Sequence, residues 1–85
     1  MTSYRVITTK RAKDQLIEIW LSASDRSAVT QAQHRIETTL SHSPRHPGRE
    51  LSEGLWRIAV QPLVAYYSID DARAVVKIAD IKFLR

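Results

Sequence analysis

The sequence predicts a two-layer α+β domain in which a pair of helices packs on one face of a small antiparallel sheet. Three observations indicate this fold. A strand-like segment opens the chain, two segments with helical periodicity follow it, and residues 51–85 hold three short apolar runs rich in β-branched and aromatic residues. Because a sheet must bury its apolar face, we expect the helices to cover it.

The first strand and the first helix are predicted from a change in the spacing of the apolar residues along the chain. Residues 4–8 (Tyr-Arg-Val-Ile-Thr) are β-prone and predict a strand at or beside the edge of the sheet. Thr8 or Thr9 can then cap a helix. One side of this helix carries an apolar stripe that should pack on the sheet, with Trp20 in the core between helix and sheet. The stripe consists of Ala12, Leu16, Ile19, Trp20 and Ala23.

A second helix is predicted directly after a polar break. The break contains four good N-cap residues, which are Ser22, Ser24, Asp25 and Ser27. Apolar residues then recur every four positions, at Ala28, Ala32, Ile36 and Leu40. Since so few residues separate the two stripes, we expect an antiparallel helical hairpin that packs on the sheet.

The segment 41–49 is expected to be a loop because it contains two prolines and a glycine. His42 and His46 lie four residues apart, but Pro44 between them interrupts the helix on which that spacing would align them. No carboxylate or thiolate lies nearby in sequence, so we expect no metal site here. In so short a chain we expect no cofactor either.

The three C-terminal runs, residues 55–60, 63–69 and 74–81, predict a β-meander. The breaks between them are too short for a crossover helix, so consecutive strands should pair as hairpins. Alternation in the first run puts Arg57 on the side opposite to the core-facing Trp56, Ile58 and Val60.

The last run is expected to present a second cation in the same way. Counting by twos places Lys77 on one face with Val75, Ala79 and Ile81. A sheet covered by helices on one face is therefore expected to carry Arg57 and Lys77 on its open face.

Composition bounds the class of protein. The 85 residues suffice for a single domain, 1–85, and with 44% hydrophobic and 26% charged residues they exclude disordered and collagen-like classes. No run approaches the ~20 apolar residues of a membrane span, and no signal peptide is evident, so we expect a cytoplasmic protein without membrane contact. The net charge of +4 favours acidic partners such as nucleic acid or an acidic protein segment.

The common catalytic motifs are missing from the sequence. It has no Gly-rich phosphate loop, no Gly-x-Ser-x-Gly, no His-Glu-x-x-His and no cysteine. What remains is a set of cations that could hold phosphates, made up of Arg49, Arg57, Arg73, Lys77, Lys82 and Arg85. Only the histidines, Tyr66 and Tyr67 are obvious proton carriers, and the two tyrosines should point to opposite faces of one strand.

The order of the elements and their residues together resemble the RelE/ParE toxin superfamily of bacterial toxin–antitoxin systems, which includes plasmid stabilisation proteins. The resemblance covers nearly the whole chain. Residues 4–20 are similar to the family's first strand and helix, 47–51 to its loop, 54–58 to its arginine-bearing strand and 64–70 to its tyrosine-bearing strand. No single piece is a strict motif, and the ordered combination carries the resemblance.

The resemblance implies a β-α-α-β-β-β fold with the N-terminal strand beside the C-terminal one. It also implies a cognate antitoxin whose C-terminal segment wraps the toxin and blocks it. Two activities occur in the family. RelE-like members cut messenger RNA in the ribosomal A site as metal-independent endoribonucleases, whereas ParE-like members poison DNA gyrase and are not nucleases.

Carried over by position, Arg57 matches the family's strand arginine and Arg49 the arginine after the Pro-Gly turn, while Lys77 and Lys82 match more loosely. The resemblance therefore implies target-binding residues Arg49, Arg57, Lys77, Lys82 and Arg85. The catalytic candidates are Arg57, Lys77 and Asp80. Family RNases tend to end in a His-Arg-Arg stretch near a tyrosine, whereas this chain ends Asp-Ile-Lys-Phe-Leu-Arg, so the proton-handling group is missing there.

The resulting hypothesis is the toxin of a type II toxin–antitoxin system, neutralised by a cognate antitoxin. It would inhibit growth by gyrase poisoning or by ribosome-dependent mRNA cleavage. Asp80 suits a salt bridge to the surrounding cations better than the role of a base, which favours a non-catalytic mode. The alternative is a non-toxic or decayed protein-binding module, and a homodimer through the helical hairpin is conceivable for either.

Overall fold

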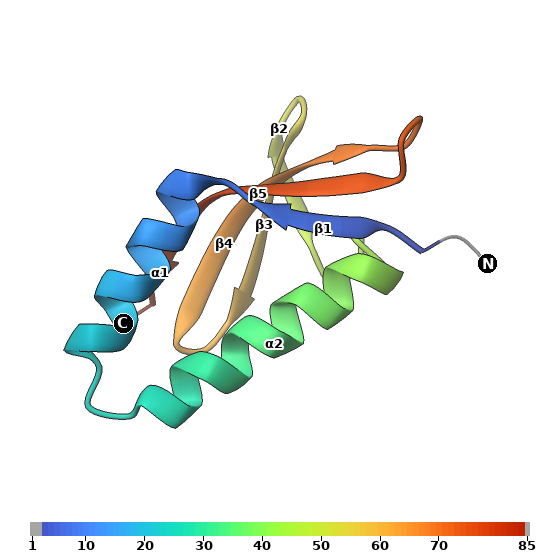
Figure 1. Cartoon of the computed structure of the whole chain (residues 1–85). Helices are drawn as coiled ribbons and strands as arrows, with labels where there is room; N and C mark the ends of the chain where they lie inside the picture. The colour runs from blue at the N-terminus through green and yellow to red at the C-terminus, as the bar shows by residue number, and fades with distance from the viewer. Residues whose placement is uncertain (1–2, 85) are drawn as a thin grey trace.

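The computed structural model describes residues 3–84, which form a five-stranded sheet with two helices on one of its faces (Figure 1). The predicted α+β architecture is confirmed. The elements in chain order are β1 (Arg5–Thr8), α1 (Lys10–Ser22), α2 (Arg26–His42), β2 (Arg49–Ser52), β3 (Leu55–Val60), β4 (Leu63–Asp70) and β5 (Val75–Phe83). Neither helix is long and apolar enough to cross a membrane.

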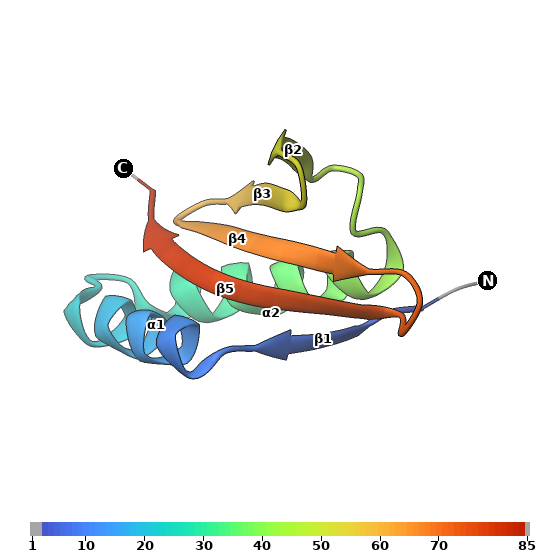
Figure 2. The same cartoon turned by 90° about the horizontal axis from the view of Figure 1, so that it is seen from above.

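The sheet differs from the prediction in two respects. Its strand order is β1-β5-β4-β3-β2 (Figure 2), and β1 runs parallel to β5, so the sheet is mixed rather than antiparallel. Two helices and three strands lie between β1 and β5 in the chain, a connection long enough for this parallel pairing. The additional strand β2 pairs with β3, and because all its residues are exposed, no alternation of apolar residues marks it in the sequence.

Both helices begin at predicted N-caps. The Thr9 hydroxyl accepts a hydrogen bond from the amide of Ala12 at 3.2 Å, and the Asp25 carboxylate accepts one from the amide of Ala28 at 3.1 Å. Of the predicted α2 stripe, Ala32, Ile36 and Leu40 are buried against the sheet and Ala28 is half-buried, and Val29 beside it is buried as well.

The expectation for Trp20 is wrong. The buried side of α1 runs through Ala12, Leu16, Ile19 and Ala23. Trp20 lies at the edge of this stripe and is 39% exposed, with the Arg26 guanidinium 4.6 Å from its ring centroid. Beside it Ile17 and Leu21 are 55% and 58% exposed, so one face of α1 is apolar and uncovered.

The alternation predicted for the last strand is interrupted by a bulge. Tyr66 pairs with Asp80 and Tyr67 with Ile78, which leaves Ala79 as an extra residue in β5. Beyond the bulge the side chains change faces. Ile81, expected beside Lys77, is therefore buried in the core, and Asp80 takes its place on the open face.

The loop between α2 and β2 is fastened to the sheet at two points. Buried Tyr67 donates a hydrogen bond from its hydroxyl to the carbonyl of Pro44 at 2.6 Å. Arg45 forms an ion pair with Asp71 at 2.6 Å, and Tyr4 donates to the same carboxylate at 2.7 Å. The hydrogen bonds from Arg45 and Tyr4 hold the pKa of Asp71 below its usual value.

Candidate functional site

The candidate site lies on the open face of the sheet, where one row of side chains crosses four strands. Strand pairing joins Arg49 of β2 to Arg57 of β3, Arg57 to Tyr66 of β4, and Tyr66 to Asp80 of β5. Paired residues in antiparallel strands project to the same face. Since Tyr67 is buried on the helix side, this row projects away from the helices.

Two lysines flank the row on opposite sides. Lys82 pairs with Val64, one open-face position before Tyr66, and its Nζ lies 5.8 Å from the Tyr66 ring centroid. Lys77 pairs with Ser68, one open-face position after Tyr66. The Tyr66 ring therefore sits at the centre of a basic surface, and Lys82 is placed for a cation–π contact with it.

Arg57 is half-buried in this row. None of the ion pairs within residues 3–84 involves Arg57, so neither Glu50, Glu53 nor Asp80 pairs with it. A half-buried guanidinium without a carboxylate keeps its capacity to bind an external acceptor.

Asp80 faces a different cation from the ones expected. Its Oδ1 atom lies 3.9 Å from Nε of Arg11 in the first turn of α1, and the Asp80 side chain is only 24% exposed. This oxygen is buried and accepts no hydrogen bond from residues 3–84. The contact at 3.9 Å is too long for a hydrogen bond, so the carboxylate is only partly compensated.

The fold thus brings most of the predicted site residues together. Arg49, Arg57 and Asp80 share one row, with Lys77 and Lys82 on either side of it. Arg85 lies outside the described residues. Sequence reasoning did not identify Arg11 as the partner of Asp80, because that contact depends on where α1 begins relative to the bulge of β5.

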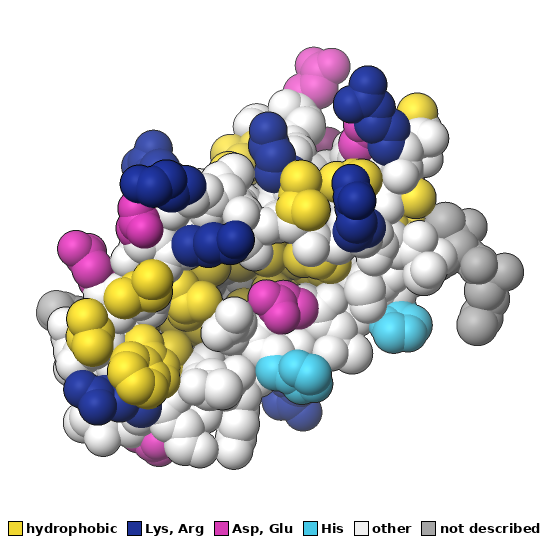
Figure 3. Space-filling model, viewed as in Figure 1, with side chains coloured by type: hydrophobic (Ala, Val, Ile, Leu, Met, Phe, Trp, Pro, Cys, Tyr) yellow, Lys and Arg dark blue, Asp and Glu magenta, His cyan; other side chains and the backbone are white. Residues whose placement is uncertain are grey.

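A second basic feature lies at the β1 end of the same face. A hollow of about 290 Å3 is formed by β1, β4, β5 and the turn between β4 and β5. Its cations are Arg5, Arg73 and Lys77, and Lys and Arg side chains gather over this part of the molecule in Figure 3. In the sequence, only the alternation of residues along the short strand β1 could have indicated that Arg5 lies on the open face.

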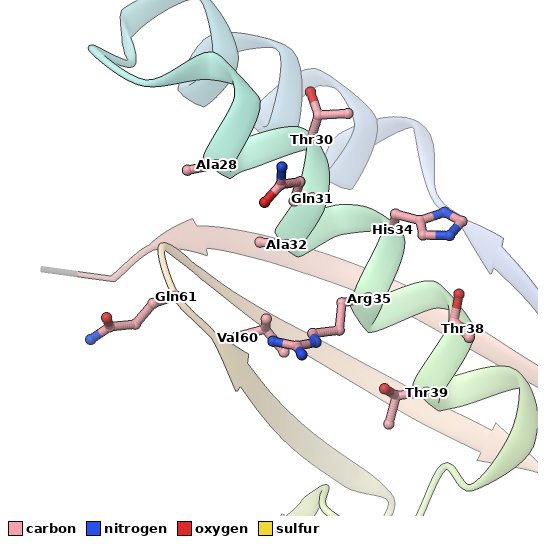
Figure 4. Close-up of a pocket in the computed structure, with 10 residues that line it drawn as sticks. All are labelled: Ala28, Thr30, Gln31, Ala32, His34, Arg35, Thr38, Thr39, Val60 and Gln61. Atoms are coloured by element: carbon pink, nitrogen blue, oxygen red, sulfur yellow. The ribbon is translucent and has the colours of Figure 1, made fainter.

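A groove of about 940 Å3 lies between α2 and the end of β3. Arg35 reaches toward Val60 across this groove, whereas Thr30 and His34 point away from it (Figure 4). Its polar groups do not converge on one point, so the groove lacks the arrangement that a catalytic site needs.

The open face can therefore bind anions through several cations. Phosphodiester cleavage also requires groups that move protons. On this face the Tyr66 hydroxyl and the enclosed Asp80 carboxylate are available for that purpose. The histidines of the protein lie away from the face, on α2 and in the loop that follows it.

Comparison with known proteins identifies relatives by sequence family and by fold. Residues 6–82 match the family described as the ParE toxin of the type II toxin–antitoxin system parDE. Among curated proteins, none matches the sequence at a significant level.

Three solved structures illustrate the similarity of the fold. A chain of the RelBE2 toxin–antitoxin complex from Mycobacterium tuberculosis is 21% identical with a TM-score of 0.80, covering 96% of this chain and 99% of that one. A chain of the chromosomal ParDE system of P. aeruginosa is 14% identical with a TM-score of 0.72, covering 98% of each. The isolated RelE toxin of E. coli is 16% identical with a TM-score of 0.69, covering 98% and 86%.

Proposed function

The chain belongs to the ParE toxin family of type II toxin–antitoxin systems, and we propose that it inhibits growth by binding DNA gyrase through the open face of its sheet. Arg57 is the centre of this contact, and Arg49, Lys77 and Lys82 surround it. The observation that carries the proposal is the position of Arg57, which is half-buried on the open face and has no carboxylate partner within residues 3–84.

The surroundings of Asp80 support binding over cleavage. A general base must reach the proton that it removes. The Asp80 side chain is 24% exposed and its Oδ1 atom is enclosed next to Arg11. In this proposal Asp80 holds α1 against the end of β5 and does not touch the target.

A ribosome-dependent RNase is the second candidate, because one observation favours it. Tyr66 pairs with Arg57 on one side and with Asp80 on the other, and Nζ of Lys82 lies 5.8 Å from its ring centroid. In an RNase these cations would hold the phosphate while Tyr66 transferred a proton. This mechanism needs Tyr66, whereas the gyrase mechanism needs only the shape and charge of the face.

We further propose that a small acidic antitoxin neutralises this toxin. Homologous toxins have been crystallised with their antitoxins, in the RelBE complexes of M. tuberculosis and E. coli. The apolar face of α1, with Ile17 and Leu21 more than half exposed, supports a partner that covers it. If a small reading frame lies beside the toxin gene, its co-expression with the toxin should restore growth.

The test compares two targets in parallel with purified protein. Wild-type toxin should inhibit DNA supercoiling by gyrase and leave cell-free translation unaffected. Arg57→Ala should abolish the inhibition while its thermal midpoint stays within a few degrees of wild type, as expected for a substitution outside the core. Arg35→Ala on α2 removes the same charge away from the open face and should inhibit like wild type.

Three outcomes would contradict the gyrase proposal. Inhibition of translation that Tyr66→Phe removes would establish the RNase mechanism instead. An Arg57→Ala toxin as active as wild type would remove the open face from the contact. A protein that inhibits neither process, and does not slow growth when induced in bacteria, would be a non-toxic binding module.

A further inference from the structure

We propose that the hollow at the β1 end of the open face binds one nucleotide of a single-stranded nucleic acid. Its cations would hold the phosphate, and its apolar part would pack against the attached nucleoside. The hollow measures about 290 Å3. This inference goes beyond gyrase binding and does not depend on it, because it requires only that the purified protein bind a nucleic acid strand.

Three cations from three separate segments line the hollow. Arg5 comes from β1, Lys77 from β5 and Arg73 from the turn before β5. Within residues 3–84, no carboxylate forms an ion pair with Arg5 or Lys77, and Nε of Arg73 lies 4.0 Å from Asp70 Oδ2, at the outer limit for an ion pair. Like charges around one hollow repel one another, so a bound anion lowers the free energy of the arrangement.

Strand pairing fixes the relative positions of these groups. Lys77 lies between Ile7 on the parallel strand β1 and Ser68 on the antiparallel strand β4. The three residues face the same side of the sheet, so an ammonium, a hydroxyl and an apolar side chain stand in one row. The hollow therefore lies on a rigid part of the fold and combines ionic, hydrogen-bonding and apolar contacts.

The apolar contact favours a nucleotide over an acidic side chain. Ile7 is 39% exposed among the cations of the hollow. A base or a ribose can cover this side chain while its phosphate meets the cations. An unpaired base exposes its face in this way and a base within a duplex does not, which favours a single strand.

Asp70 points to the same class of ligand. Its carboxylate lines the hollow and can only accept hydrogen bonds when ionised. Asp70 Oδ1 already accepts a hydrogen bond from the backbone N–H of Arg73 at 3.2 Å, and the amino and hydroxyl groups of a nucleotide can donate further bonds to this carboxylate while the phosphate meets the cations.

The binding test uses fluorescence anisotropy with short labelled single strands of DNA and of RNA, measured over a salt series. Each ion pair with a phosphate of a single strand contributes about 0.7 to the slope of log K against log salt. Because the three cations share the phosphate of one nucleotide, Arg5→Ala, Arg73→Ala and Lys77→Ala should each weaken binding and lower the slope by a part of that amount, and the triple variant should lower it by about 0.7. Lys13→Ala, which removes an exposed cation of α1, should leave the slope unchanged.

A second variant tests the apolar contact separately. Ile7→Ala removes no charge, so it should weaken binding several-fold at every salt concentration with an unchanged slope. These side chains are exposed, and a thermal midpoint near that of wild type shows that each variant folds.

Four results would overturn the inference. The first is that no strand binds, and the second is that Lys13→Ala lowers the slope as much as the variants of the hollow do. The third is displacement of the strand by inorganic phosphate or free nucleoside monophosphate at equal concentration. The fourth is tighter binding of an oligoglutamate peptide with the same residue dependence. Failure of the gyrase proposal is distinguishable. Arg5→Ala and Arg73→Ala change the hollow outside the proposed gyrase contact and should leave gyrase inhibition intact, whereas Arg57→Ala should remove it, and strand binding is measured without gyrase.

Discussion

Tyr66 and Tyr67 are neighbours in β4, but they lie in opposite environments. Tyr67 is fully buried on the helix side, and its hydroxyl donates to the carbonyl of Pro44. Tyr66 is half-buried on the open face, paired with Arg57 and Asp80 and covered in part by Lys82. The alternation of one strand thus separates a residue that stabilises the fold from one placed for contact with a partner.

The two faces as wholes show the same division. Within residues 3–84 the fully buried set of the core contains no charged side chain. The open face carries Arg57, Lys77 and Lys82, and none of them takes part in an ion pair in that part of the chain. Substitutions on the covered face should therefore change the free energy of unfolding, and those on the open face should change binding.

The largest effect on stability is expected at Gly48, where the loop crosses Tyr67. A Cβ on Gly48 would overlap with the Tyr67 hydroxyl and lie 2.8 Å from the carbonyl oxygen of Pro44. The Tyr67 ring is buried and cannot move aside without breaking its hydrogen bond. Gly48→Ala should lower the free energy of unfolding by about 2–4 kcal/mol, measured by denaturant titration.

Gly54→Ala is the matched control for Gly48→Ala. Gly54 has a φ of 81°, but no atom lies within 4 Å of a Cβ built there. Its substitution should cost only the strain of a left-handed alanine, about 1 kcal/mol. Equal losses for the two variants would show that the loop does not press on Tyr67.

The next effect is a loss of stability at alkaline pH that arises from the covered face. Burial raises the pKa of Tyr67 to about 12, and the charge of Arg45 opposes this rise. The unfolded tyrosine has a pKa of about 10 and loses its proton first. The stabilisation is therefore fully present below pH 10 and is lost as pH rises from about 10 to 12, by up to roughly 1.4 kcal/mol per pH unit.

Denaturant titrations across that pH range, on wild type and on Tyr67→Phe, check the alkaline loss. All other ionisable groups are the same in both proteins, so the difference between the two curves isolates Tyr67. The difference in the free energy of unfolding between wild type and Tyr67→Phe should become smaller as pH rises. Curves that stay parallel from pH 9 to 12 would mean that the hydroxyl is accessible to solvent.

The covered face could be predicted from the sequence because periodicity is a local property. The helical stripe of Ala32, Ile36 and Leu40 and the alternation around Ile58 both gave the correct buried side. Ile81 could not be placed, because a bulge in β5 changes the alternation and no residue type marks it. Trp20 was misplaced for a related reason, since a residue at the edge of a stripe is buried or exposed according to the packing of its neighbours.

The open face could be predicted only in part. Alternation identified Arg57 as facing away from the core, and the family resemblance singled it out, but neither could show that no carboxylate of residues 3–84 pairs with it. The pairing of Asp80 with Arg11 and the convergence of Arg5, Arg73 and Lys77 join residues more than 60 positions apart. Such contacts follow from the position of β1 beside β5, which no local pattern contains.

The smallest effects are expected from the tyrosines themselves, and they measure the difference between the faces directly. Tyr67→Phe leaves the buried carbonyl of Pro44 without its donor and should lower the free energy of unfolding by about 1–2 kcal/mol. Tyr66→Phe removes a half-buried hydroxyl from the open face and should change the free energy of unfolding by less than about 0.5 kcal/mol. The same denaturant titration measures both. If Tyr66→Phe is the more destabilising variant, the open face contributes to the stability of the fold, and loss of activity on that face could no longer be assigned to a lost contact with the target.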